Sequence, residues 1–248
     1  MEITVLGCGA AFPRAGGACS GFLAASGVTR VWIDAGNGTF SNLQKHVSYR
    51  DLDALVITHA HSDHLADVMP LMYALGFDPE QPPQTVPVYA PFDIEPTLMS
   101  PLGGKSKEIF KTVFDFRKIT DRFEIGTIGF EPFPTKHPAE SFGVRMSDGG
   151  KVAVYTSDTA LFPGLVDACR GADLLICEAT YVDRIESDPG VHMWAREAGR
   201  MATEAGAMRL VLTHVWGTID PAEAVAEAAE EFSGPVEAAI EGARYSVL

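Results

Sequence analysis

A short segment, residues 58–64 with the sequence T-H-A-H-S-D-H, constrains this chain more than any other. It follows the apolar run 54–57, whose branched residues predict a buried strand that ends at the first histidine. His59 and His61 are two positions apart and therefore point to the same side of an extended chain, whereas Asp63 and His64 turn onto the start of the next helix. Three imidazoles and one carboxylate in six residues are not the composition of an ordinary polar loop. We therefore interpret the segment as a site that faces two metal ions.

The pattern H-x-H-x-D-H after a buried strand resembles the metallo-β-lactamase superfamily. In the β-lactamases proper the last position is usually not histidine, whereas ribonuclease Z and related phosphodiesterases have a histidine there, as His64 is here. The resemblance spans nearly the whole chain. Together with strands that alternate with helices and carry ligands at their ends, it implies an α/β fold, a four-layer αββα sandwich of two mixed β-sheets in a single domain over residues 1–248.

The same resemblance assigns three residues later in the chain. His137, in the motif H-P-x-E-S-F-G, matches the isolated mid-chain histidine of the family. Asp158, in S-D-T, matches the aspartate that bridges two metals, and His214, after the expected strand 208–213, matches the histidine that closes the second metal site. Without the resemblance, an aspartate after a strand would more often cap a helix than bind a metal.

Two sets of metal ligands follow from this resemblance. Seven side chains are implied, three for the first ion (His59, His61, His137), three for the second (Asp63, His64, His214) and one shared between them (Asp158). Nitrogen and carboxylate ligands without thiolate suit zinc, and manganese or iron would also fit. Two divalent ions about 3.5–4 Å apart orient a bridging hydroxide and stabilise negative charge on the reacting centre, so no protein nucleophile is needed.

Two further residues are candidates for catalysis, together with Asp63. His192 occupies the place of a histidine that acts on the substrate in related enzymes, and we expect it to protonate or hydrogen-bond the leaving oxygen. Glu178 lies in an E-A-T element that resembles the H-E-A-T of ribonuclease Z, although Cys177 replaces the histidine, and we expect Glu178 to orient His192. The alternative for His192 is an ordinary loop residue. Of the seven histidines, only His46 has no expected role.

The expected substrate is a small phosphodiester, such as a cyclic mononucleotide. Ribonuclease Z of the tRNA-processing kind carries a long arm between the third histidine and the bridging aspartate, whereas His137 and Asp158 are only 21 positions apart. A net charge of −14 also repels nucleic acid, so a long RNA or DNA partner would need a local basic patch. The chain thus resembles armless bacterial hydrolases that include atypical cyclic-nucleotide phosphodiesterases.

Other functions remain open at this point. A lactone or ester hydrolase is the runner-up among hydrolases, and a ribonuclease Z-type RNA 3′-processing endonuclease is a further alternative. A di-iron protein that reduces oxygen or nitric oxide would usually carry a glutamate in place of His61 and would work with a flavin domain. A noncatalytic metal-binding module would be expected to have lost ligands, and none is missing here.

Several weaker features complete the expectations. The basic stretch from Lys105 to Arg122 is interpreted as a solvated helix face, with contact to a substrate phosphate or a partner subunit as the alternative. Asp34 follows a strand and is expected to bond backbone or to orient a ligand histidine. Residues 65–75 carry apolar residues at helical spacing up to Gly76. We expect a cytoplasmic protein with no membrane partner, free thiols, and a homodimer by analogy with the family.

Overall fold

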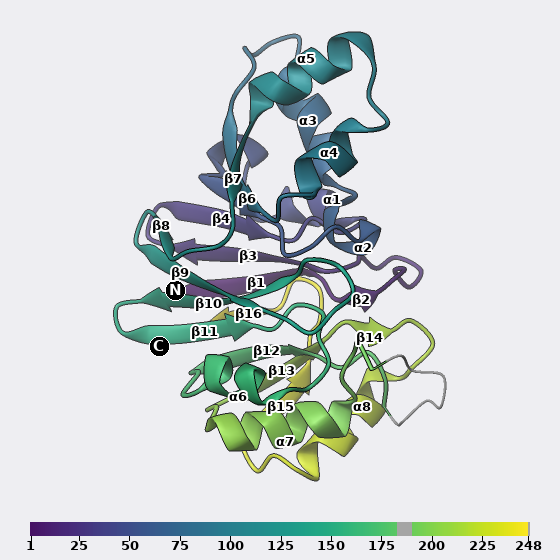
Figure 1. The fold of residues 1–248 in the computed structure, drawn as a ribbon, viewed down its shortest axis with the longest axis vertical. Helices are drawn as coiled ribbons and strands as arrows, with labels where there is room; N and C mark the ends of the chain where they lie inside the picture. Colours follow the sequence, from purple (N-terminus) through teal and green to yellow (C-terminus); the bar gives the residue numbers. More distant parts are fainter. Residues whose placement is uncertain (183–189, 248) are drawn as a thin grey trace.

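The computed structural model describes residues 1–182 and 190–247, which form two seven-stranded sheets packed face to face (Figure 1). In spatial order the first sheet contains β16 (Arg244–Ser246), β1 (Glu2–Gly7), β3 (Gly21–Ser26), β4 (Thr29–Ile33), β5 (Ala54–Val56), β6 (Val86–Ala90) and β7 (Phe114–Lys118). The pairs from β16 to β4 are antiparallel and those from β4 to β7 are parallel. The first sheet is therefore mixed.

The second sheet repeats this arrangement with later strands. In spatial order it contains β15 (Val236–Ala238), β13 (Leu210–Thr213), β12 (Leu174–Glu178), β11 (Lys151–Tyr155), β10 (Phe142–Asp148), β9 (Ile128–Pro134) and β8 (Phe123–Ile125). The pairs from β15 to β11 are parallel and those from β11 to β8 are antiparallel. A parallel pair of two-residue strands, β2 (Gly9–Ala10) and β14 (Val215–Trp216), joins the N-terminal and C-terminal parts of the chain.

Helices cover the outer face of each sheet (Figure 1). The first sheet carries α1 (Thr39–Leu43), α2 (Ser62–Leu65), α3 (Val68–Gly76), α4 (Ile94–Met99) and α5 (Gly104–Val113), with a 3-10 turn at Tyr49–Asp51. The second sheet carries α6 (Pro163–Cys169), α7 (Ala195–Ala205) and α8 (Pro221–Ala229). The predicted four-layer αββα sandwich of two mixed sheets is thus confirmed, whereas the single-domain assignment stays a prediction.

Burial on both faces explains why the strands are continuously apolar. Successive residues of a strand point to opposite faces, so Val31 and Ile33 of β4 enter the core between the two sheets, while Trp32 packs under the helices of the first sheet. In the second sheet, Ile176 of β12 enters the shared core and Leu175 packs under α6 and α7. Such two-sided burial is typical of parallel strands covered by helices.

Two expectations about local structure need correction. The helix expected over residues 65–75 is divided into α2 and α3, because the backbone N–H of Asp67 donates to Ala35 O (2.8 Å) and its carboxylate accepts from the N–H of Phe40 (2.8 Å). The basic stretch forms a helix face only as far as Val113 and then continues as strand β7.

The structure also describes the cysteines, the segment between His137 and Asp158, and the length of the helices. The four cysteines are free thiols, as predicted. Between His137 and Asp158 the chain forms the tight hairpin of β10 and β11, with Gly149 and Gly150 at its turn. Within the described residues, no helix has the length and apolar character required to cross a membrane.

Gly36 lies where the loop after β4 meets α2, and we predict that alanine there is destabilising. A Cβ atom on Gly36 would overlap the carbonyl oxygen of Asp63 and lie 2.7 Å from that of Ser20, and neither backbone atom can rotate away. Gly36→Ala should lower the free energy of unfolding by about 1–3 kcal/mol in chemical denaturation. Gly103→Ala is the control, because its Cβ would meet no atom within 4 Å; since Gly103 is the N-cap residue of α5, the change in stability should be less than about 1 kcal/mol. Equal effects of the two substitutions would contradict this account of the packing.

Candidate metal centre

The candidate ligands gather at one edge of the sandwich because each follows a strand whose carboxyl end lies there. His59 and His61 follow β5, and α2 then presents Asp63 and His64, as expected from the sequence. The remaining three come from the other sheet: His137 after β9, Asp158 after β11 and His214 after β13. The site therefore lies between the two sheets and takes ligands from both.

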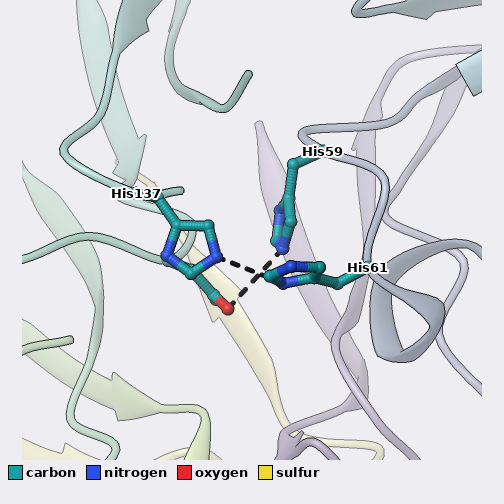
Figure 2. Close-up of side chains that lie close together, drawn as sticks. His59, His61 and His137 are labelled. Carbon is teal, nitrogen blue, oxygen red and sulfur yellow. Dashed lines mark hydrogen bonds and ion pairs between the residues drawn. The ribbon is translucent and has the colours of Figure 1, made fainter. Parts of the chain in front are cut away.

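Within the described part of the chain, the ligand atoms form three overlapping groups, and Asp158 belongs to two of them. His59, His61, His137 and Asp158 each place one ligand atom within 4.8 Å of the others, and Figure 2 shows the three imidazoles of this group converging. Asp63, His64 and His214 form the second group, and Asp158, His192 and His214 form a third, each also within 4.8 Å. The structure thus brings together the side chains that the sequence assigned to two ions, and their division into two sets stays a prediction.

Asp158 contacts both groups. Its Oδ2 lies 3.6 Å from Nε2 of His59 and 3.3 Å from Nε2 of His214, while its Oδ1 lies 3.2 Å from Nε2 of His64. Asp63 joins the second group through its Oδ2, which lies 3.3 Å from Nε2 of His214. One buried carboxylate is therefore in position to be shared by two cations.

The unpaired atoms of this cluster fit divalent cations. Among the described residues, no hydrogen-bond partner reaches the buried Nε2 atoms of His59 and His64 or Oδ1 of Asp158. His64 Nε2 and Asp158 Oδ1 lie 3.2 Å apart without hydrogen-bond geometry, as expected for atoms directed at a common point. Buried polar atoms without partners are costly, and a nitrogen and carboxylate donor set matches zinc, manganese or iron.

The surroundings of the buried His59 and His64 shift their pKa values in opposite directions. Burial lowers the pKa of His59 well below its ordinary value, and the neighbouring His64 lowers it further, so His59 is neutral and able to bind a metal at pH 7. Burial opposes protonation of His64 too, but the carboxylates of Asp158 and Asp34 outweigh it and raise the pKa of His64 well above its ordinary value. Binding of a metal by His64 must therefore displace a proton.

The two carboxylates are held in the ionised form. Burial favours the neutral acid of Asp158, but His214 and His64 outweigh it and lower the pKa of Asp158 well below its ordinary value. Burial acts in the same direction on Asp63, but the hydrogen bond from His214 outweighs it and lowers the pKa of Asp63. Both groups are therefore anions at neutral pH, as metal ligands must be.

On the side of the first sheet, Asp34 fixes the orientation of the histidines. Its Oδ2 accepts hydrogen bonds from Nδ1 of His64 (2.8 Å), from Thr58 Oγ1 (2.8 Å) and from the hydroxyl of Tyr155 (3.0 Å). Its Oδ1 accepts from the backbone N–H of Thr58 (2.8 Å), so both roles expected for Asp34 occur together. Thr58 Oγ1 in turn lies 3.1 Å from Nδ1 of His59. With both Nδ1 atoms engaged, Nε2 of each ring is directed into the cluster.

On the side of the second sheet, Glu178 orients histidines as Asp34 does on the side of the first sheet. Its Oε1 lies 3.0 Å from Nδ1 of His192, the contact expected from the sequence, and accepts from the N–H of Thr159 (2.6 Å). Its Oε2 accepts from Thr180 Oγ1 (2.7 Å), which lies 2.9 Å from Nδ1 of His214. On each side, therefore, a threonine hydroxyl links a buried carboxylate to a ligand histidine.

Comparison with known proteins identifies the family. The β-lactamase superfamily domain matches residues 29–215. The probable metallo-hydrolase YhfI of Bacillus subtilis is 32% identical over 230 residues, covering 87% of each protein. The chain belongs to the metallo-β-lactamase superfamily. The crystal structure of YhfI has a TM-score of 0.88 with this structure, at 31% identity and 99% coverage of both chains.

Two further proteins are similar to this chain. Ribonuclease Z of Myxococcus xanthus is 28% identical over 298 residues, covering 98% of this chain and 96% of that enzyme. A diphosphatase from the PhnP family shares the fold with a TM-score of 0.78, at 19% identity, covering 99% of this chain and 97% of that one. The predicted resemblance to ribonuclease Z-like hydrolases is thus confirmed. Membership implies a metallo-hydrolase that uses a divalent metal, and the two groups around Asp158 are its candidate ligands.

Sequence reasoning missed the groups that hold the histidines in place. Thr58, Thr180 and Tyr155 were not predicted, although each contacts a carboxylate that orients a ligand histidine. Thr58 directly precedes His59, and Thr180 ends the E-A-T element, so adjacency to a motif was the available signal. Tyr155 gave no signal, because it reaches Asp34 from the other sheet. His46 lies apart from both groups, as expected, and contacts Arg244.

The threonine link on the side of the second sheet leads to a test. Thr180→Val keeps the shape of the side chain but removes the hydroxyl between Glu178 and His214. We expect metal affinity to fall by about 10- to 100-fold, measured by competition with a chromophoric chelator. Thr180→Ser retains the hydroxyl and should stay within about threefold of the unaltered chain. If the valine and serine variants bind metal equally well, the hydroxyl does not orient His214.

Proposed function

We propose that this chain is a dinuclear metal-dependent hydrolase that cleaves a small phosphodiester. The observation that carries the proposal is the buried carboxylate of Asp158, which contacts histidines of both ligand groups. His59, His61 and His137 would hold one ion, Asp63, His64 and His214 the other, and Asp158 both. Two divalent ions, zinc or else manganese or iron, would supply Lewis-acid stabilisation of the phosphoryl oxygens and lower the pKa of water at the site.

In this proposal His192, oriented by Glu178, donates a proton to the leaving group. The His192 ring centroid lies 5.5 Å from that of His214 and 5.3 Å from that of His137, so it borders both ligand groups. Because its Nδ1 contacts the buried Glu178, we assign to Nε2 the transfer of a proton to the leaving oxygen. Glu178 sets the orientation of the His192 ring. Asp63 contributes as a ligand that the backbone N–H of Ala11 (2.8 Å) and His214 fix in place.

A small substrate is favoured over a long nucleic acid. The hairpin of β10 and β11 fills the interval between His137 and Asp158 where ribonuclease Z carries its arm. The basic stretch from Lys105 to Arg122 does not replace that arm as a surface for nucleic acid. Arg117 pairs with Asp115, and Arg122 pairs with Glu131. Helix α5 lies outside α3 and away from α2, which carries two of the candidate ligands (Figure 1). The net charge of −14 further opposes binding of a polyanion. RNA 3′ processing is the second candidate, because of the identity to ribonuclease Z along nearly the whole chain.

The first test combines metal content with turnover. Protein purified without chelator should contain about two ions per chain by elemental analysis and should cleave bis(p-nitrophenyl) phosphate and 3′,5′-cyclic AMP, with loss of activity after chelation. Two ions without phosphodiester cleavage would contradict the proposed substrate and direct assays to lactones and esters. Cleavage of precursor tRNA in preference to both small phosphodiesters would favour the second candidate.

Separate roles for His192 and Asp158 are the second test. His192→Ala should lower kcat by about 10²- to 10⁴-fold and leave metal content unchanged, because the residue is assigned to proton transfer. Asp158→Ala should lower both metal content and kcat, because the residue is assigned to both ions. His46→Ala is the matched control, since His46 contacts Arg244 at the surface, and it should change neither quantity. Equal metal loss in the His192 and Asp158 variants would contradict these assignments.

A further inference from the structure

Three aromatic side chains border the candidate site and take no part in the chemistry proposed above. Phe12, Tyr181 and Trp216, which we call the aromatic rim, form a contiguous group. The rings of Phe12 and Trp216 meet edge to face at 5.5 Å and 89°, and the rings of Tyr181 and Trp216 lie 6.2 Å apart at 34°. The Tyr181 ring also lies 6.2 Å from that of His192, at 85°. The aromatic rim therefore adjoins the residue assigned to the leaving group.

Each residue of the aromatic rim follows closely on a contact to a metal ligand. The N–H of Ala11 donates to Asp63 (2.8 Å), and Phe12 is the next residue. Thr180 Oγ1 contacts Nδ1 of His214 (2.9 Å), and the next residue is Tyr181. Trp216 stands two residues after His214 itself. The chain segments that fix the second ligand group thus also fix the aromatic rim beside it.

Core packing does not explain the aromatic rim. In the described part of the chain, neither Phe12 nor Trp216 belongs to the three buried hydrophobic clusters or to the partly buried residues packed against them. Phe12 is 44% exposed, and Trp216 is only partly buried. Large aromatic rings left at the surface contribute less to stability than buried ones, and grouped beside a reactive site they are typical of ligand recognition.

Backbone and side-chain contacts within the protein fix the positions of Phe12 and Trp216. Trp216 pairs with Ala10 across β2 and β14. Arg14 ties the same two segments together by donating from Nε to Gly217 O (3.0 Å) and from Nη2 to Ile219 O. The ring of Phe12 packs against Gly217, where a Cβ atom would lie 2.8 Å from Cε2 of that ring. A surface fixed in advance loses little entropy when a flat group binds on it.

We propose that the aromatic rim is a stacking surface for the nucleobase of the substrate, with Trp216 as its principal residue. The inference rests on the proposed function, because it assigns the organic part of the phosphodiester to a place beside the metal centre. Stacking of a base on an aromatic side chain needs no hydrogen-bond partner and accepts any base, which suits a surface built from rings. Nucleotide-type esters are then preferred over alkyl esters.

Equilibrium binding tests this inference apart from turnover. Titration calorimetry on the metal-loaded protein would compare adenosine 5′-monophosphate with ribose 5-phosphate, which carries the same phosphate and sugar but no base. Trp216→Ala should weaken binding of adenosine 5′-monophosphate by about 5- to 150-fold and leave that of ribose 5-phosphate within about twofold. Trp216→Phe should restore most of the affinity. Tyr73→Ala is the control, because Tyr73 lies on α3, is 49% exposed and contacts the ring of Phe77 at 5.4 Å and 30°, and it should change neither affinity.

The outcomes separate the two proposals. Equal weakening of both ligands by Trp216→Ala, or no preference of the unaltered protein for adenosine 5′-monophosphate over ribose 5-phosphate, would overturn the stacking surface, even if phosphodiesters are cleaved. A base preference that depends on Trp216, in a protein that cleaves no phosphodiester, would uphold the stacking surface and refute the proposed reaction.

Discussion

The structure depends on the burial of one carboxylate between two groups of histidines. Asp158 is 2% exposed, and its oxygens lie 3.2–3.6 Å from Nε2 atoms of His59, His64 and His214. Several kcal/mol is a typical cost for moving an ion into a protein interior, and it is offset only by charges and hydrogen bonds of good geometry. Among the described residues, Nε2 of His59, Nε2 of His64 and Oδ1 of Asp158 have no hydrogen-bond partner, so bound cations would complete the arrangement better than the protein atoms alone.

The backbone conformation of several residues at the site also depends on the surrounding fold. Among the described residues, the non-glycine residues with positive φ are Ala11 (52°), Asp34 (53°), Ser157 (54°) and His214 (55°), and all belong to the site or adjoin it. This left-handed conformation costs about 1–2 kcal/mol for a residue with a side chain. At Ala11 this conformation directs the backbone N–H to Asp63, and at Asp34 it directs the carboxylate to His64. At Ser157 and His214 it lies in the segments that carry Asp158 and His214 into the cluster. The packing of the two sheets stabilises these strained backbone conformations, which the local sequence alone would not adopt.

The cluster in residues 58–64 could be proposed from local patterns, and His137, Asp158 and His214 from the resemblance to the family, whereas the groups that support these side chains could not be predicted. His59 and His61 share a face through strand alternation, and the later ligands follow strands whose apolar runs are plain in the sequence. The support of His64 by Asp34 and Tyr155 joins residues 121 positions apart and on different sheets, and no spacing rule reports it. The division of the expected helix 65–75 likewise depends on Ala35 and Phe40, outside its own segment.

A crystal structure of the protein loaded with zinc, with anomalous diffraction data at the zinc absorption edge, would test whether two metal ions share Asp158. We expect two anomalous peaks about 3.5–4 Å apart, with Asp158 contacting both. One peak would belong among His59, His61 and His137 and the other among Asp63, His64 and His214. A single peak that Asp158 does not contact, or no peak at this edge of the sandwich, would contradict this expectation.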